Sequence, residues 1–298
     1  MIFIGEIAAI LTAVLWALSS YFFSRATIKI GSVNVNFTRL LISLILFVIT
    51  ILILKIPFKV STFQLWMLMA SGVVGLVLGD SFFFKSLEYL SPRISILVTS
   101  FTPAVSAIMA LIFLQEQLSY LKISGMLIAL SGIILVVFRK EENTGPAKSA
   151  KGIRKGIILA FLYTIGQSTG LILAKSAFNE SEVNSILATT IRIFPAVIVL
   201  FPYYLLKGKN FNFFKIFRKD LIAFKDVFVA AILSAYLGMV FMFVAITQTN
   251  IAVASTIIAT IPIIQLVISR YIYKEKLTWR SVTGAFVTVG GMVLLFLH

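Results

Sequence analysis

The stretch GDSFFFKSLEYLSP at residues 79–92 decides the architecture of this chain, because its pattern returns 159 positions later. The same offset joins pairs of identical residues along the chain: Gly79/Gly238, Phe82/Phe241, Phe84/Phe243, Pro103/Pro262, Glu116/Glu275, Leu118/Leu277, Gly125/Gly284 and Gly132/Gly291. Self-similarity at a fixed offset is typical of a duplicated architecture. The chain is therefore expected to fold as two copies of one unit.

Each copy contains five apolar segments of about 20 residues, the length at which a helix spans a bilayer. We predict helices over residues 3–23, 33–54, 65–87, 94–114, 118–138, 156–175, 183–206, 227–247, 252–273 and 277–297. Spanning segments are helical because lipid offers no partners for backbone polar groups. Five crossings per copy place the second copy upside down. The predicted fold is an all-α integral membrane protein of ten transmembrane helices in two inverted five-helix repeats.

The domain boundaries follow from the duplication. The first repeat is expected at residues 1–140, a basic linker at 141–155 and the second repeat at 156–298. The longest polar stretch, residues 139–155, separates the two copies and includes Gly145 and Pro146, which are typical of a flexible connection.

Composition excludes several classes of function. Hydrophobic residues make up 60% of the 298 residues and charged ones 12%, against about 25% charged in soluble domains. No cysteine is present, and the only histidine is His298, so thiolate chemistry, metal sites and cofactor attachment are not indicated. The net charge of +15 lies in loops between apolar spans, which favours lipid headgroups over nucleic acid as partners.

Basic residues also predict an orientation. They gather in the loops after odd-numbered helices, whereas the loops after even-numbered helices offer little beyond Lys55 and Lys59. The positive-inside rule then places the odd loops in the cytoplasm and both termini outside.

The chain resembles the EamA-type members of the drug/metabolite transporter superfamily. The residues that carry the resemblance are Leu15-Trp16, Thr38-Arg39-Leu40, the stretch 79–92, Pro103 and Glu116-Gln117-Leu118-Ser119 in the first copy, and Arg192, Pro262 and Glu275-Lys276-Leu277-Thr278 in the second. The resemblance implies a ten-helix exporter or exchanger of small metabolites with a central cavity between the halves. It also implies termini inside for many members, which is opposite to the orientation that the loop charges favour.

Charges that lie deep within predicted spans need a reason, because each costs about 2.5–3.5 kcal/mol on insertion scales. Arg39 and Asp80 lie at similar depth in antiparallel helices and are expected to form an ion pair. That pair is either static, or opens during transport with Asp80 taking a proton or contacting a substrate ammonium. The third alternative is that the two residues never meet.

The second copy breaks this symmetry. Arg192 matches Arg39, but Met239 stands where the first copy has Asp80. Arg192 is expected either to bind backbone carbonyls or reach the headgroups, or to attract a substrate carboxylate or phosphate.

Further residues are candidates for the cavity or for hinges. Pro103 and Pro262 are expected in mid-helix, where each removes a backbone hydrogen bond and acts as a hinge or as a static kink. The polar or aromatic cavity candidates are Trp16, Ser19, Ser20, Tyr163, Gln167, Tyr236 and Gln248, beside Arg39, Asp80 and Arg192.

The predicted function is secondary transport of a small metabolite, an amino acid or a similar polar or amphipathic solute, by alternating access. The expected protein is an exporter or exchanger in the plasma membrane of a prokaryote, with membrane lipids as neighbours and protons as the candidate coupling ion. The sequence contains no phosphate-binding loop of the GxxxxGK[ST] type, so direct use of ATP is not indicated. The alternatives are a channel-like or receptor-like membrane protein and, last, a membrane-embedded enzyme, which a single deeply placed acid disfavours.

Overall fold

The computed structural model of the chain describes residues 3–113, 119–137, 149–206, 220–248, 257–272, 274 and 277–296. The regular structure of these residues is helical. The first copy contains α1 (Ile4–Ile30), α2 (Ser32–Leu54), α3 (Thr62–Gly72), η1 (Val73–Gly79), α4 (Asp80–Ser86), α5 (Pro92–Thr99), α6 (Thr102–Phe113) and α7 (Tyr120–Val137). The second contains α8 (Ala150–Glu180), α9 (Ser185–Leu206), α11 (Leu221–Ala230), η3 (Ala231–Gly238), α12 (Met239–Gln248), α14 (Ile261–Tyr271) and α15 (Trp279–Phe296).

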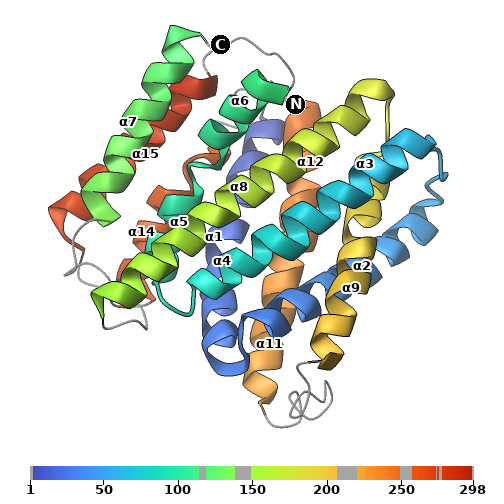
Figure 1. The fold of residues 1–298 in the computed structure, drawn as a ribbon, viewed down its shortest axis with the longest axis horizontal. Coiled ribbons are helices and arrows are strands. Elements are labelled where there is room, and N and C mark those ends of the chain that lie inside the picture. The colour runs from blue at the N-terminus through green and yellow to red at the C-terminus, as the bar shows by residue number, and fades with distance from the viewer. Residues whose placement is uncertain are drawn as a thin grey trace.

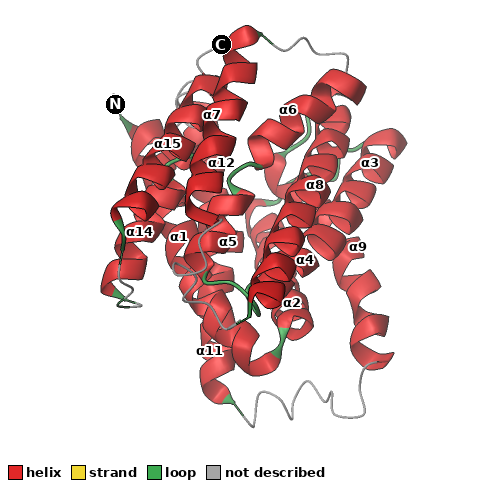
Figure 2. Cartoon of the chain, turned by 60° about the vertical axis from the view of Figure 1, so that its left-hand side comes forward, coloured by secondary structure: helices red, strands yellow, loops and turns green. Residues whose placement is uncertain are grey.

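Seven of the described spans are long and apolar enough to cross a membrane, and shorter apolar helices cover Ile123–Val136 and Ile261–Tyr271. Consecutive segments such as α3, η1 and α4 form one continuous span, Thr62–Ser86. Large apolar side chains face outward, for example Leu52 and Ile53 of α2, which are 69% and 72% exposed. Such a surface suits lipid rather than water. Figure 1 shows the resulting bundle, and Figure 2 its helical composition from a second side.

The final helices of the two copies, α7 and α15, lie side by side in both views (Figures 1 and 2). Their glycines make the contact: a Cβ built at Gly132 would lie 2.6 Å from the Gly284 carbonyl oxygen, and one at Gly291 would lie 2.5 Å from the Gly125 carbonyl oxygen. Gly125, near the start of α7, therefore meets Gly291, near the end of α15, and Gly132 meets Gly284. The two equivalent helices run antiparallel.

The centre of this contact lies between two equivalent residues. Thr288 Oγ1 donates to the Ala129 carbonyl oxygen at 3.5 Å, and these residues are separated by the repeat offset of 159. A residue that touches its own repeat equivalent across antiparallel helices marks a pseudo-twofold axis in the membrane plane. The prediction of an all-α protein with two inverted halves is confirmed.

A widened π-helical turn occurs at the same place in both copies, in η1 and η3. Such turns misalign backbone carbonyls, which then accept from other groups. Gln167 Nε2 donates to the Gly75 carbonyl oxygen at 3.3 Å, and Trp16 Nε1 donates to the Ser234 carbonyl oxygen at 3.1 Å. Gly75 and Ser234 are repeat equivalents, so each half inserts a side chain from its first helix into the third span of the other.

Reciprocal glycines bring the halves close along η1 and α8. A Cβ built at Gly170 would lie 3.1 Å from Gly75 Cα, and one at Gly166 would lie 2.9 Å from Gly79 Cα. Both helices thus use glycines spaced by four residues, which permits near contact of the backbones. The pair Gly75 and Gly79 packs a helix, as its GxxxG spacing predicts.

Two predicted helices are interrupted. The span 94–114 is divided by a turn at residues 100–101, and Pro103 lies in the first turn of α6. Pro262 likewise lies in the first turn of α14, after a turn at 259–260. The expectation of prolines inside continuous helices is therefore wrong. Proline is tolerated at a helix start because the amide it lacks has no partner there.

Helix α8 begins within the stretch predicted as the linker. Helix α8 begins at Ala150, because Ser149 Oγ accepts from the Gly152 amide at 3.1 Å and caps the helix. The last six residues of the stretch 141–155 are therefore helical. Residues 141–148 of that stretch, and the first part of the predicted ninth span, lie outside the described residues.

Candidate functional site

Arg39 and Asp80 meet in an ion pair between α2 and the start of α4. Their side chains are 12% and 8% exposed, so the pair is nearly shut off from solvent. The Arg39 guanidinium also lies over the rings of Phe23 and Phe84, at 6.0 and 5.3 Å from their centroids. Aromatic faces attract a cation and hold it in place. The alternative in which Arg39 and Asp80 never meet is excluded.

Gln167 of α8 joins this pair from the other half. Its Nε2 donates to Asp80 Oδ1 at 2.8 Å as well as to the Gly75 carbonyl oxygen. Tyr163, one turn earlier on α8, packs against Phe83 with ring centroids 5.3 Å apart. The carboxylate of Asp80 is therefore bound by one side chain from each half of the molecule.

Two polar residues of this cluster are missing from the sequence-based candidates. Asn36 donates from Nδ2 to the Leu76 carbonyl oxygen at 3.0 Å and to Ser81 Oγ at 3.2 Å, and it accepts from Arg39 Nη2 at 3.2 Å. The signal for Asn36 is its spacing, because it lies three residues before Arg39 and thus on the same helix face. Ser81 directly follows Asp80. Asn36 and Ser81 fix the orientation of the charged pair.

Arg192 of α9 lies beside this cluster without joining it. The position of a Cβ at Gly75 would be 3.6 Å from Arg192 Nη2 and 3.4 Å from Gln167 Oε1. The residue is partly buried, and its Nε is buried without a hydrogen-bond partner. Met239, which stands where the first copy has an aspartate, packs with an apolar cluster that includes Ile193.

A second, uncharged group lies between α1 and the second half. Trp16 is bonded to η3 as described, and Ser20 Oγ donates to Gln265 Oε1 of α14 at 3.1 Å. Ser19 bonds only within its helix, to the Trp16 carbonyl oxygen at 2.8 Å. Gln265 is fully buried, and its Nε2 has no hydrogen-bond partner among the described residues. It was not among the predicted residues, although an amide three residues after Pro262 in an apolar run is a readable signal.

The remaining candidates lie apart from the charged cluster. Tyr236 of η3 shares a hydrogen bond with Thr50 of α2, with 2.7 Å between the hydroxyl oxygens. Gln248 is exposed at the end of α12. The structure therefore brings together Arg39, Asp80 and Gln167, places Tyr163 and Arg192 next to them, and leaves Gln248 outside.

The halves also touch at one end of the bundle through charges. Lys29 Nζ of α1 lies 3.4 Å from Asp220 Oδ1, and Arg25 Nε lies 3.2 Å from Asp226 Oδ2. The Ala223 amide, which donates to Asp220, holds the pKa of that carboxyl below its usual range, and Lys29 adds to this effect. These are contacts between the first helix of one half and the third span of the other.

The equivalent contact at the other end, between α3 and α8, has an uncharged residue in place of the aspartate. Ser61, the repeat equivalent of Asp220, donates from Oγ to Glu180 Oε2 of α8 at 2.7 Å. Gln64 Nε2 donates to the carbonyl oxygens of Ala177 at 3.1 Å and Ser181 at 2.9 Å. Because the halves are inverted, the two contacts lie at opposite ends of the spans.

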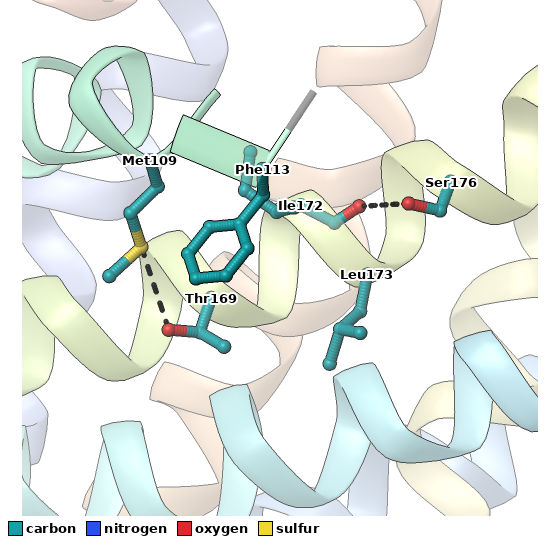
Figure 3. A pocket seen from close by; sticks show the side chains of 6 residues that line it. All are labelled: Met109, Phe113, Thr169, Ile172, Leu173 and Ser176. Atoms are coloured by element: carbon teal, nitrogen blue, oxygen red, sulfur yellow. Dashed lines mark hydrogen bonds between the residues drawn. The ribbon is translucent and has the colours of Figure 1, made fainter. Parts of the chain in front are cut away.

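Two pockets occur elsewhere and are apolar. One, of about 250 Å³, lies between α6 and α8 and is lined by Met109, Phe113, Thr169, Ile172, Leu173 and Ser176. Figure 3 shows that its two hydroxyls are already bonded: Thr169 to Met109 Sδ and Ser176 to the Ile172 carbonyl oxygen. The other, of about 300 Å³, is lined by eight apolar side chains of α5, α7 and α8. The charged cluster is therefore the better candidate site for a polar solute.

A multi-pass membrane protein with two inverted halves and a charged cluster between them belongs to the class of transporters. Comparison with known families agrees: the EamA-like transporter family matches residues 3–138 and 154–297. The chain belongs to the EamA-like transporter family, as its motifs suggested. It groups with transporters and not with enzymes.

Individual proteins resemble the chain as well. An uncharacterized transporter of Archaeoglobus fulgidus is 23% identical over 288 residues, which cover 97% of this chain and 95% of that protein. A protein of known crystal structure aligns with a TM-score of 0.63 at 13% identity, over 96% of this chain and 98% of the other. The second likeness concerns the fold alone.

Proposed function

We propose that the protein is a secondary transporter that carries a small polar or amphipathic metabolite, such as an amino acid, by alternating access, and that it works as an exporter or exchanger. The observation that carries this proposal is the bonded cluster of Arg39, Asp80 and Gln167 at the seam between the halves. Charges in spanning segments are costly and mark solute or ion pathways. A cluster contributed by both halves changes whenever the halves move relative to one another.

The equivalent contacts at the two ends support the alternating-access part of the proposal. Opening one end separates α1 from α11, where Lys29 meets Asp220. Opening the other separates α3 from α8, where Ser61 meets Glu180. Internal symmetry makes the two movements equivalent, so a rocking motion opens one end while the other stays closed.

Asp80 is the candidate for coupling to protons. Protonation would remove its charge and with it the ion pair to Arg39, so the bond network between the halves would weaken. The proposed location is the cell membrane of a prokaryote, a proposal that the archaeal relative supports.

Solute counterflow in proteoliposomes tests the function. Candidate solutes are first selected from a metabolite panel by thermal stabilisation of the purified protein, because a ligand of the folded state raises its stability. Liposomes loaded with unlabelled solute are then expected to accumulate the labelled solute transiently. A pore or an enzyme gives no such overshoot, and its absence for every stabilising solute would overturn the proposal.

The double variant R39A/D80A tests whether the cluster takes part in transport. It removes both charges together and leaves neither one unpaired, so it is expected to remain folded. We expect it to elute as a monodisperse species in size-exclusion chromatography and to lose counterflow. Retained counterflow would show that the cluster is not part of the solute site.

A further inference from the structure

We propose that Arg192 binds the carboxylate of the transported solute, so that the solute is a carboxylate-bearing metabolite rather than a neutral or cationic one. This inference rests on the proposed function and adds the chemistry of one binding group to it. Three observations carry it: the lack of a partner for Arg192, the direction of its side chain and the balance of charges at the seam.

Arg192 has no hydrogen-bond or ion-pair partner among the residues that the structure describes. Its guanidinium makes no hydrogen bond or ion pair within the described part of the chain, and its Nε is buried. A guanidinium group stays protonated in proteins, so Arg192 keeps its positive charge. An arginine in a spanning helix costs about 2.5–3.5 kcal/mol, and Arg192 has only the attraction of Asp80, beyond ion-pair distance, to offset that cost. The Arg192 guanidinium is therefore available to bind an anionic group.

The side chain points into the protein. A Cβ at Gly72 would lie 1.8 Å from the Arg192 carbonyl oxygen, so α9 is pressed against α3 at this point. The guanidinium continues along the same seam, with Nη2 close to Gly75 and to Gln167 of α8. Arg192 is the eighth residue of α9, about 10 Å from its start at 1.5 Å per residue. This direction favours a solute between the halves over a lipid headgroup at the surface.

The three charges in and beside the central cluster, Arg39, Asp80 and Arg192, leave room for one negative charge. Arg39 and Arg192 are cations and Asp80 is an anion, so one positive charge is left over. The excess arises because Met239 stands in the second copy where the first copy has Asp80. A carboxylate carries a single negative charge and matches the fork of guanidinium donors. A phosphate monoester carries about 1.5 to 2 negative charges and would exceed the available balance, with Asp80 nearby.

The test measures binding to the purified protein by calorimetry and thermal shift. The probes are amino acids and small monocarboxylates, each paired with its amide, with one phosphate monoester and phosphatidylglycerol as further arms. We expect at least one carboxylate to bind while its amide does not. R192Q is expected to weaken that binding roughly ten- to hundredfold, the effect of losing a charged hydrogen-bonded pair. R154Q, at an exposed arginine near the start of α8, is the matched control and is expected to bind as the parent does.

R192K serves as a second variant should R192Q not remain folded. Lysine keeps the positive charge but lacks the paired N–H donors of the guanidinium, so this variant is expected to bind the carboxylate more weakly than the parent does. The inference is overturned if no carboxylate in the panel binds, if amides bind equally well, or if the arginine variants bind as the parent does. It is also overturned if only phosphatidylglycerol or the phosphate monoester depends on Arg192. Counterflow of an uncharged solute in that case would leave the transporter proposal standing.

Discussion

Among single residues, Asp80 joins the two halves through contacts that depend on its charge. It is paired with Arg39 from its own half and accepts a hydrogen bond from Gln167 of the other half. Loss of its negative charge therefore acts on both halves at once. The proton coupling that we propose is therefore tested at Asp80.

We expect Asp80→Asn to abolish transport driven by a proton gradient while solute exchange at equal pH persists. Asparagine keeps the size and the acceptor oxygen, so the bond from Gln167 survives while the titrating group is lost. Gradient-driven uptake and exchange are both measured in proteoliposomes. Glu182→Gln, at an exposed acid outside the cluster, serves as the control and is expected to retain both activities. Loss of both activities in Asp80→Asn, or of neither, rules out the coupling role.

At the scale of helices, the two ends of the seam differ in chemistry although they are related by the repeat. The contact of α1 with α11 is ionic, through Lys29 and Asp220. The contact of α3 with α8 uses the serine hydroxyl of Ser61 where the other end has a carboxylate. The contact between α1 and α11 is therefore expected to weaken in acid and at high salt through Asp220. Acid removes the charge of Asp220, and salt screens an exposed ion pair. The serine hydroxyl of Ser61 carries no charge to lose or to screen.

Asp220→Asn removes the ion pair with Lys29 but keeps the helix cap, because asparagine caps a helix as well as aspartate does. The folded-state pKa of Asp220 is lowered, so the stability it contributes is present above the unfolded pKa, about 3.9, and is lost as the pH falls through the folded value. We expect the variant to unfold at a lower temperature than the parent at pH 7. That difference is expected to shrink as the pH falls below about 4.

Thermal unfolding in detergent, stepped from pH 7 downward, measures this difference. Lys225→Gln removes a nearby exposed charge of α11 and is the matched control. A difference between Asp220→Asn and the parent that is unchanged by pH would contradict the role of the ion pair. Persistence of the difference at high salt would do so as well.

For the whole molecule, the inverted halves place the start of α1 and the end of α15 at the same end of the bundle (Figure 1). Several basic residues that predict orientation lie on helices rather than in loops. Lys29 is in the last turn of α1, and Arg93 is buried in α5, where its Nη1 donates to Ser281 Oγ at 2.6 Å. These charges contribute to packing as well as to the bias across the membrane.

Single cysteines test the orientation without interference, because the chain contains no cysteine. Lys151→Cys, at the start of α8, is expected to resist an impermeant maleimide in intact cells. Lys59→Cys, in the short connection before α3 at the opposite end, is expected to react quickly. Both positions are exposed. The reverse pattern would place the termini in the cytoplasm, as the family resemblance suggests.

Much of the fold and part of the site could be predicted from residues alone. The depth of Arg39 and Asp80 in antiparallel spans was enough to predict that they pair, because both charges are costly in lipid. The bond from Gln167 to Asp80 could not be predicted, since it depends on how α8 is rotated against η1. The turns before Pro103 and Pro262 were missed because hydropathy is the same across a broken and an unbroken helix.

By itself the sequence determined the number of spans, their duplication and the inversion of the halves, because a bilayer admits only helices of a certain length and an odd count reverses direction. Only the tertiary structure decided which polar side chains meet, that Asp80 is shared by both halves and that Arg192 is left without a partner. The reason is that contacts between helices depend on rotation and close approach. Glycines such as Gly75 and Gly170 set that approach, and their partners lie far away along the chain.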